Sequence, residues 1–375
     1  MLKKIIVVGY YGYDNLGDDL MLWCFLKEMS TKLPDVEISL LSKPSSNLDK
    51  ICENFENVTL KPFKINSKLY NIRVFLKAIL SHDLTIWGGG TCFSEEDGIG
   101  NYRYFLLNTL LNKPYAYLGI GIGNLKRTKS LKKTKFLLER AEFVTFRDEQ
   151  SFNFSKRICH RGDFYLTADL AYINTGDIDA PIKKPKVDKG YILVSLRELS
   201  KFFPIDVINE RHKALQDFLI GLIVKEEIKQ IIFLPIDTEK DLMVNKTFMN
   251  GLTIAIDDEV ELRLIEENDL HIKMDYVLNA DLNITERLHS MVISEFNNVP
   301  CVSLSYSPKI DRFYNLDLGE DNYVSYETKL SEKILWGVYE RLEKESESGL
   351  EDRINTLSEL GKKNIEILTE YLYRD

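Results

Sequence analysis

The sequence predicts an α/β fold made of two Rossmann-like lobes and a C-terminal helical tail. Short β-rich runs alternate with amphipathic segments along most of the chain, and glycine-rich turns often follow the runs. This alternation is typical of domains with mostly parallel sheets. Residues 177–189 break the rhythm, because they include Pro181, Pro185 and several lysines but few large apolar side chains. We interpret this segment as a linker between the lobes.

The first lobe is expected to cover residues 1–176. It opens with a short apolar run that begins like a secretory signal but leads straight into Tyr10-Tyr-Gly-Tyr-Asp, without a cleavage-site pattern, so we predict a buried strand. The expected strands of this lobe are residues 4–9, 36–41, 84–87, 115–120 and 143–146. The expected helices are residues 19–32, 69–81, 102–112 and 130–140.

The alternation restarts in a second lobe, residues 190–327. Its expected strands are residues 191–196, 230–234, 261–265, 282–285 and 301–306. Its expected helices are residues 207–225, 240–250, 271–279 and 288–298. The remaining segment, residues 328–375, is strongly charged and is predicted to be helical from about residue 331 to 373.

The composition excludes several classes of protein. A chain of 375 residues that is 44% hydrophobic can form two cores. Its formal charge of −9 disfavours binding to nucleic acid. It contains no run of 18 apolar residues, so no transmembrane helix is expected. The five cysteines are scattered and form no CxxC pair, so we expect a cytoplasmic protein without a disulfide framework, zinc site or other metal site.

The most informative feature is Arg287-Leu288-His289, where an apolar strand is predicted to end and a helix to begin. Ligands of α/β folds bind at the carboxyl ends of strands, and helix N-termini favour anions because their first N–H groups are unpaired. Arg287 and His289 at this junction are suited to a small, highly charged anion and a proton transfer. A histidine alone is more often structural, but the nearby arginine and the strand-end position favour the functional interpretation.

Two further arginines, Arg147 and Arg197, also follow predicted strands. Each is either a salt-bridge partner or a fork that binds a carboxylate or phosphate in bidentate fashion. Asp169 stands in an otherwise apolar stretch. It is either a buried, hydrogen-bonded group or a base near the cleft between the lobes.

The first strand-to-helix turn contains the candidate sugar contacts Tyr11, Asn15 and Asp18. Its spacing does not match G-x-G-x-x-G and it has no P-loop lysine, so neither a dinucleotide nor a nucleoside triphosphate is indicated. Its rings and amides suit a glycan, and the alternative is a plain turn in which Asn15 or Asp18 caps the helix. Gly89 and Gly90 follow another strand and either form a tight turn or let the backbone approach a ligand.

Residues 126–135 form a basic run. Most such runs are solvated helix faces, and the alternative is a patch for anionic lipid or a lipid-linked diphosphate. The six basic side chains of the run are Lys126, Arg127, Lys129, Lys132, Lys133 and Lys135.

Together these segments resemble the polysaccharide pyruvyl transferase family. The ordered pieces cover roughly residues 1 to 320, and the block from Arg287-Leu-His289 to Tyr306-Ser-Pro-Lys309 is the most specific part. The earlier pieces are Gly9-Tyr-Tyr-Gly, Asn15-Leu-Gly-Asp18, Gly88-Gly-Gly90, Leu118-Gly-Ile-Gly, Phe146-Arg-Asp-Glu-Gln-Ser151 and Ala168-Asp169.

The resemblance implies a GT-B-like fold and transfer of the pyruvyl group of phosphoenolpyruvate onto two hydroxyls of one sugar. The products would be a cyclic pyruvate ketal and phosphate, without a separate cofactor. Arg287, Leu288, His289 and Arg147 would bind the donor, with His289 as general acid and with Arg287 and Arg147 as the anion clamp. Arg197 is added to the donor residues because of its placement after a strand. Tyr11, Asn15, Asp18, Gly89, Gly90 and Asp169 would lie on the side of the acceptor.

The acceptor would be a sugar of a cell-surface polysaccharide or its lipid-diphosphate-linked precursor, with the enzyme at times peripheral at the inner face of the membrane. Two alternatives stay open. One is a GT-B glycosyltransferase that uses a nucleotide sugar, and the other is a non-catalytic glycan-binding scaffold.

Overall fold

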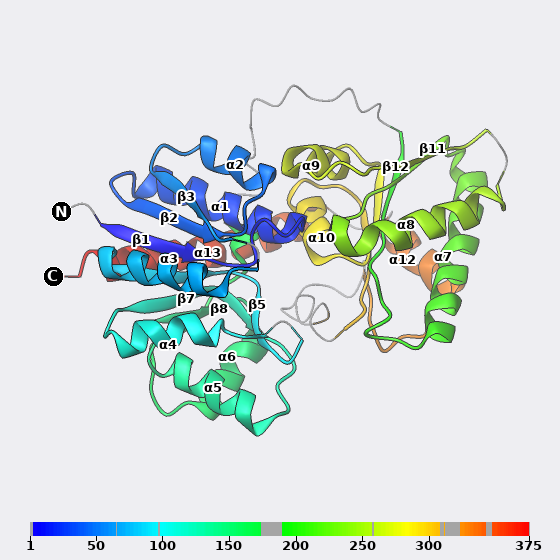
Figure 1. Ribbon diagram of the computed structural model, residues 1–375. Helices are drawn as coiled ribbons and strands as arrows, with labels where there is room; N and C mark the ends of the chain where they lie inside the picture. The colour runs from blue at the N-terminus through cyan, green and yellow to red at the C-terminus, as the bar shows by residue number, and fades with distance from the viewer. Residues whose placement is uncertain are drawn as a thin grey trace. The chain divides into compact units, whose positions relative to one another are not determined.

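A computed structural model describes residues 3–64, 66–96, 98–173, 190–256, 259–307, 311, 323–342 and 347–374. The chain divides into two compact units (Figure 1). Unit 1 comprises residues 1–13, 18–175 and 355–375, and unit 2 comprises residues 14–17 and 176–354. The predicted linker, residues 177–189, lies outside the described residues. The segment 328–375, expected to be a separate tail, is divided between the two units at residue 355.

Unit 1 is built on a mostly parallel sheet with the order β3-β2-β1-β4-β7-β5-β6, and β8 and β9 continue from β7. The central strand β7 is buried at every position, as expected for a strand covered on both faces. The pairing of β5 with β6 is antiparallel. The strands are β1 (Lys4–Val8), β2 (Glu37–Ser42), β3 (Val58–Pro62), β4 (Leu84–Gly88), β5 (Thr91–Ser94), β6 (Gly98–Ile99), β7 (Tyr115–Ile122), β8 (Val144–Phe146) and β9 (Phe164–Leu166).

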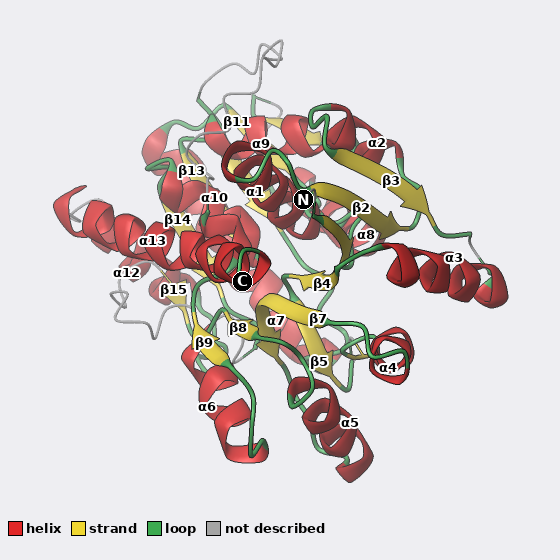
Figure 2. Ribbon diagram, turned by 90° about the vertical axis from the view of Figure 1, so that its left-hand side faces the viewer, coloured by secondary structure: helices red, strands yellow, loops and turns green. Residues whose placement is uncertain are grey.

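Helices pack against this sheet, and Figure 2 shows α4, α5 and α6 on the side of β7 and β8. Aromatic side chains of the strands and of α4 form much of the core; for example, the ring centroids of Phe105 and Tyr117 lie 4.9 Å apart. The helices are α1 (Leu16–Lys32), α2 (Ser46–Glu53), α3 (Lys68–Ser81), α4 (Tyr102–Leu110), α5 (Thr128–Leu138), α6 (Glu149–Ile158) and the short 3₁₀ helix η1 (Leu170–Tyr172).

Unit 2 contains a parallel sheet with the order β12-β11-β10-β13-β14-β15. The order reverses between β10 and β13, which is the arrangement of Rossmann folds and marks the crevice where such sheets bind ligands. The strands are β10 (Ile192–Ser195), β11 (Gln230–Phe233), β12 (Glu261–Leu264), β13 (Leu282–Thr285), β14 (Cys301–Leu304) and β15 (Tyr323–Val324). The helices are α7 (Ile205–Glu226), α8 (Thr238–Thr253), α9 (Leu270–Leu278), α10 (Leu288–Phe296) and α12 (Glu332–Leu342).

The last helix, α13 (Glu347–Leu372), contributes its C-terminal part to unit 1. Asn364 is fully buried there and is bonded to three residues of the segment around β8 and β9. Its Oδ1 accepts hydrogen bonds from the hydroxyls of Thr145 and Thr167, and its Nδ2 donates to the carbonyl of Ala168. These bonds complete unit 1 with a segment that is about 200 residues away in sequence.

We predict that Asn364→Ala destabilises unit 1 by about 1–3 kcal/mol, because it leaves several buried polar groups without their partner. Urea unfolding followed by circular dichroism measures the change. Lys363→Ala, an exposed neighbour on the same helix, is the matched control and is expected to change the midpoint little. Equal midpoints for the two variants would contradict the structural role of Asn364.

Candidate functional site

The carboxyl edge of the sheet in unit 2 brings together four of the predicted donor residues. Strands β10 and β13 are neighbours and pair Ser195 with Thr285, so the residues that follow both strands emerge at one edge. Arg197 follows β10, and Arg287-Leu288-His289 follows β13. This edge lies at the reversal of strand order, the position at which α/β sheets bind ligands.

Arg287 is the residue before helix α10 and is 7% exposed. Its Nε donates to Oδ2 of Asp241 at 2.7 Å, and its Nη2 donates to Oδ1 at 2.5 Å. Oδ2 of Asp237 lies 3.8 Å from Nη2. Burial alone would lower the pKa of Arg287, but the charge and hydrogen bonds of Asp241 outweigh it and raise that pKa above its ordinary value. Arg287 is therefore a charged group whose guanidinium is already held in a bidentate ion pair.

The sequence analysis missed Asp237 and Asp241. Asp237 caps α8 by accepting from the backbone N–H of Lys240, and its carboxylate also lies 2.7 Å from Nζ of Lys240. Asp241 additionally accepts from the backbone N–H groups of Glu198 and Asp237. The sequence pattern that could have predicted them is a pair of acidic residues four positions apart, at the start of a helix that follows a strand. That spacing places both side chains on one face of the helix.

His289 is the second residue of α10, and its imidazole packs against the backbone of Gly17. A Cβ atom added at Gly17 would lie 2.0 Å from Nδ1 of His289, which is far inside van der Waals contact. Gly17 does not have a positive φ, so the requirement for glycine at this position is steric.

The backbone around Gly17 is held to unit 2 by hydrogen bonds. The N–H of Leu16 donates to the carbonyl of Ile236, and the N–H of Thr238 donates to the carbonyl of Asp14. The side chain of Asn268 donates to Oδ1 of Asp14 at 2.6 Å. Residues 14–17 therefore belong structurally to unit 2, although the residues on either side of them in sequence belong to unit 1.

Asn15 accepts a hydrogen bond from the N–H of Gly17 at 3.0 Å, which confirms the expectation that Asn15 or Asp18 caps the first helix. Asn15 lies in unit 2, whereas the other candidate acceptor residues lie in unit 1. The predicted acceptor loop is thus divided between the units.

Arg197 is partly exposed, and aromatic rings hold its guanidinium. The guanidinium carbon lies 4.2 Å from the ring centroid of Tyr306 and 5.0 Å from that of Phe202, and Nη1 donates to the hydroxyl of Tyr306. The backbone N–H of Arg197 donates to Oε2 of Glu286 at 3.0 Å. Leu288 has a buried side chain, so it can offer a ligand its backbone only.

Arg147 and Asp169 are paired with each other inside unit 1. Nη1 of Arg147 lies 2.5 Å from Oδ2 of Asp169, Nη2 donates to the hydroxyl of Thr91 at 2.9 Å, and Arg147 is 1% exposed. The salt-bridge interpretation of Arg147 and the buried interpretation of Asp169 both hold. Asp169 therefore occupies the guanidinium that was expected to be an open anion fork. The pairing could not be predicted, because the two residues are 22 positions apart in sequence.

Tyr11 is not part of a sugar-stacking surface, which corrects the expectation from its sequence. Its ring is fully buried, and its hydroxyl donates to the carbonyl of Gly88 at 2.5 Å. Burial, followed by the charges of Asp18, Asp19 and Asp169, raises the pKa of Tyr11. The exposed ring of this turn is that of Tyr13, which is 44% exposed.

Gly89 and Gly90 have positive φ values of 73° and 75°, a conformation that favours glycine. A Cβ atom at Gly90 would lie 3.6 Å from Oδ1 of the partly buried Asp18. The two glycines and Asp18 thus lie close together in unit 1.

In the described ranges no helix is long and apolar enough to cross a membrane.

Comparisons with known proteins give a consistent picture. A sequence model of the family described as polysaccharide pyruvyl transferase matches residues 15–308. The chain is 21% identical over 350 residues to the amylovoran biosynthesis protein AmsJ of Erwinia amylovora, covering 82% of this chain and 84% of that protein.

Solved structures are similar in fold. The UDP-GlcNAc 2-epimerase of Methanocaldococcus jannaschii has a TM-score of 0.65 at 15% identity, covering 98% of this chain and 99% of the other. A glycosyltransferase of Rickettsia africae has a TM-score of 0.59 at 12% identity, covering 100% of both chains. At these identities the likeness establishes the fold alone, and it confirms the predicted α/β architecture of the GT-B type.

We predict that Arg287→Ala destabilises unit 2 by about 3–5 kcal/mol, because it leaves the buried carboxylate of Asp241 without its cation. Chemical unfolding measures this loss. Lys240→Ala removes an ion-pair partner from the same cluster, but its side chain is 60% exposed and its loss should cost at most about 1 kcal/mol. Similar losses for the two variants would show that Arg287 is not held as described.

Proposed function

Because this chain belongs to the polysaccharide pyruvyl transferase family, and is therefore a transferase of polysaccharide biosynthesis, we propose that its donor is phosphoenolpyruvate. The pyruvyl group would be transferred onto two hydroxyls of one sugar, in a cell-surface polysaccharide or its lipid-linked precursor. The products are a cyclic pyruvate ketal and phosphate. The observation that carries this proposal is the position of His289 at the start of α10, two residues after Arg287. Its imidazole packs against the backbone of Gly17.

The charge of the donor matches this edge of unit 2. Phosphoenolpyruvate carries a carboxylate and a phosphate on a small carbon frame, and binding it takes cations and unpaired N–H groups. The N-terminal end of α10, where Arg287 makes no side-chain cap, presents the positive end of the helix dipole to an anion. We assign Arg197 the main cationic contact, since its guanidinium is partly exposed, whereas that of Arg287 is buried against Asp241.

The reaction needs one proton delivered to carbon. His289 would donate a proton to the methylene carbon of phosphoenolpyruvate, which becomes a methyl group and leaves an oxocarbenium-like centre at the neighbouring carbon. One sugar hydroxyl attacks that centre and loses its proton. The bond from this carbon to the phosphate oxygen then breaks, and the second hydroxyl closes the ring and loses its proton. A positioned acid of this kind contributes about 10²–10⁴-fold.

Arg287 would have a second role besides contacting the donor. Its ion pair with Asp241 fixes the residue before α10, and the backbone of that helix fixes His289. Hydrogen-bond donors that are held in position in this way stabilise the charge that develops on a leaving phosphate. On the acceptor side we propose Asn15, Asp18, Gly89 and Gly90.

The experiment that tests the proposal is a phosphate-release assay with phosphoenolpyruvate against a panel of lipid-linked hexoses and N-acetylhexosamines. Mass spectrometry of the sugar product should show the gain expected from a pyruvate ketal. Transfer of a sugar from a nucleotide sugar, without phosphate release from phosphoenolpyruvate, would establish the glycosyltransferase alternative instead. Glycan binding without turnover on any acceptor would favour the scaffold.

We predict that His289→Ala lowers kcat by about 10²–10⁴-fold while phosphoenolpyruvate still binds, because the variant removes the acid and leaves the cations. Steady-state phosphate release gives kcat, and isothermal titration gives the donor affinity. His160→Ala, which changes an exposed histidine of unit 1, is the control and should retain full activity. Wild-type turnover in His289→Ala would remove His289 from the mechanism.

We predict that Gly17→Ala lowers kcat through His289, because its Cβ must displace the imidazole. In the background of His289→Ala the same change should have little further effect, so the two losses should be strongly non-additive. Gly251→Ala is the control, since a Cβ there meets no atom within 4 Å. Additive losses in the double variant would show that Gly17 acts independently of the imidazole.

A further inference from the structure

A hollow of about 560 Å³ lies between α4 and α5 of unit 1, and none of its lining residues is assigned to the reaction. Helices α4, α5 and α6 lie side by side in this part of unit 1 (Figure 1). We call this feature the lysine hollow. It is lined by Tyr102, Thr128, Lys129, Lys132, Lys133 and Phe136.

The positive charge of the lysine hollow is not balanced by acidic neighbours. In the part of the chain that the structure describes, no carboxylate forms an ion pair with Lys129, Lys132 or Lys133. The flanking cations differ, since Arg127 lies 3.5 Å from Glu95 and Lys135 lies 3.6 Å from Glu139. The net charge of the whole chain is −9, so the protein as a whole repels anions. The lysines of the hollow attract anions locally in spite of that net charge.

Two aromatic rings form the apolar part of the lysine hollow. The ring centroids of Tyr102 and Phe136 lie 6.0 Å apart, and Nζ of Lys133 lies 4.8 Å from the ring centroid of Tyr102. Lysines beside partly exposed aromatic rings are typical of surfaces that meet the headgroup region of a bilayer. The hydroxyl of Thr128 adds a polar contact for a phosphate oxygen.

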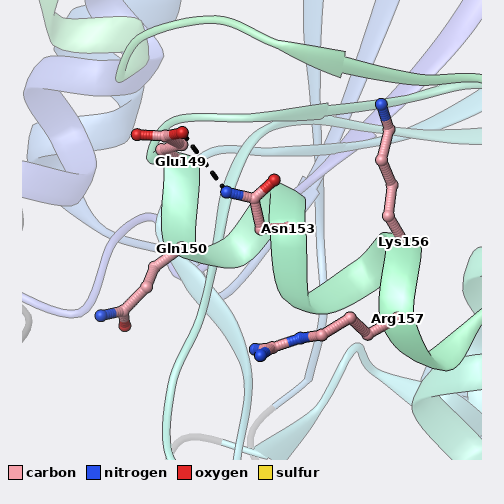
Figure 3. A pocket seen from close by; sticks show the side chains of 5 residues that line it. All are labelled: Glu149, Gln150, Asn153, Lys156 and Arg157. Carbon is pink, nitrogen blue, oxygen red and sulfur yellow. Dashed lines mark hydrogen bonds between the residues drawn. The ribbon is translucent and has the colours of Figure 1, made fainter.

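A second hollow on the neighbouring helix α6, of about 610 Å³, has a different character (Figure 3). Lys156 and Arg157 extend from the last turn of α6, but the carboxylate of Glu149 accepts a hydrogen bond from Asn153 at the other end of the same surface. Its charges are mixed and no aromatic ring lines it. The lysine hollow, by contrast, is lined by three lysines and two aromatic rings.

We propose that the lysine hollow docks the protein on a bilayer by binding the phosphate of anionic phospholipid headgroups. Docking would hold unit 1 at the surface from which a lipid-diphosphate-linked sugar is presented, and this second step rests on the proposed function. The binding of headgroups itself does not depend on phosphoenolpyruvate chemistry.

Co-sedimentation of the full chain with vesicles tests the docking. Vesicles of phosphatidylcholine alone are compared with vesicles that also contain phosphatidylglycerol. The test variant combines Lys129→Ala, Lys132→Ala and Lys133→Ala. The control variant combines Lys213→Ala, Lys229→Ala and Lys329→Ala, which removes the same formal charge from exposed lysines of unit 2.

The wild type and the control variant should bind the phosphatidylglycerol vesicles, and binding should weaken as salt is raised. The test variant should bind about 100-fold more weakly, since each lysine near an anionic surface contributes roughly a factor of five. Three outcomes would overturn the docking: wild type that does not prefer phosphatidylglycerol, unchanged binding of the test variant, or equal losses in both variants.

Failure of docking and failure of the proposed function are separable. Phosphate release from phosphoenolpyruvate on a soluble sugar acceptor should be the same for the test variant and the wild type, because none of the three lysines lies in the reaction site. Vesicle binding without phosphate release would refute the proposed chemistry alone. Phosphate release without vesicle binding would refute the docking alone.

Discussion

The ion pair between Arg287 and Asp241 holds together the edge of unit 2 on which the candidate site depends. Asp241 also accepts a hydrogen bond from the backbone N–H of Glu198, which follows β10. Asn245, one turn further along α8, bonds both the N–H and the carbonyl of Leu196. The ends of β10 and β13 and the start of α8 are therefore tied to one carboxylate and one amide. Removing both charges of a buried ion pair from water costs free energy, and only good geometry with further hydrogen bonds offsets that cost. Here both carboxylate oxygens are fully engaged, so the start of α10 is fixed before any ligand binds.

Gly17 extends this rigid edge with a segment from the opposite end of the sequence. Its neighbours Asp14 and Leu16 bond the backbone after β11, and Lys273 donates to the same stretch at Ile236 and Thr238. The imidazole of His289 thus rests on backbone that is itself held in place, which is what a proton donor requires if its position is to be defined. A side chain at position 17 would take the space of the imidazole. The glycine in Asn15-Leu-Gly-Asp18 is explained by this contact and not by the turn in which it occurs.

Sequence patterns predicted the inner parallel strands of each sheet and missed several strands toward the sheet edges. The strand Leu282–Thr285 was predicted with its observed bounds, because it is a short apolar run between clear turns. Strands β3 and β9 were missed, since most of their residues are only partly buried, β3 contains no continuous apolar run, and the apolar run of β9 is only 3 residues long. Tyr11 shows a second limit: the sequence identifies a ring beside glycines, but the long-range bond to Gly88 decides that the ring faces the core. The contact of His289 with Gly17 joins residues too far apart in sequence for any local pattern to reveal it.

Arg147, Arg197 and Arg287 illustrate why a local motif cannot assign a role. Each follows a parallel strand, and each could serve as an anion fork on that evidence alone. Long-range partners separate them: Asp169 closes on Arg147, and Asp241 closes on Arg287, in both cases with the guanidinium buried. The rings of Tyr306 and Phe202 instead support Arg197 from the side and leave it partly exposed. A ligand can reach a charged group only through an exposed edge, so a small anion at this edge of unit 2 would contact Arg197 more fully than Arg287. In the proposed reaction the buried arginine would hold the helix start and the imidazole in position, and the exposed one would neutralise the ligand.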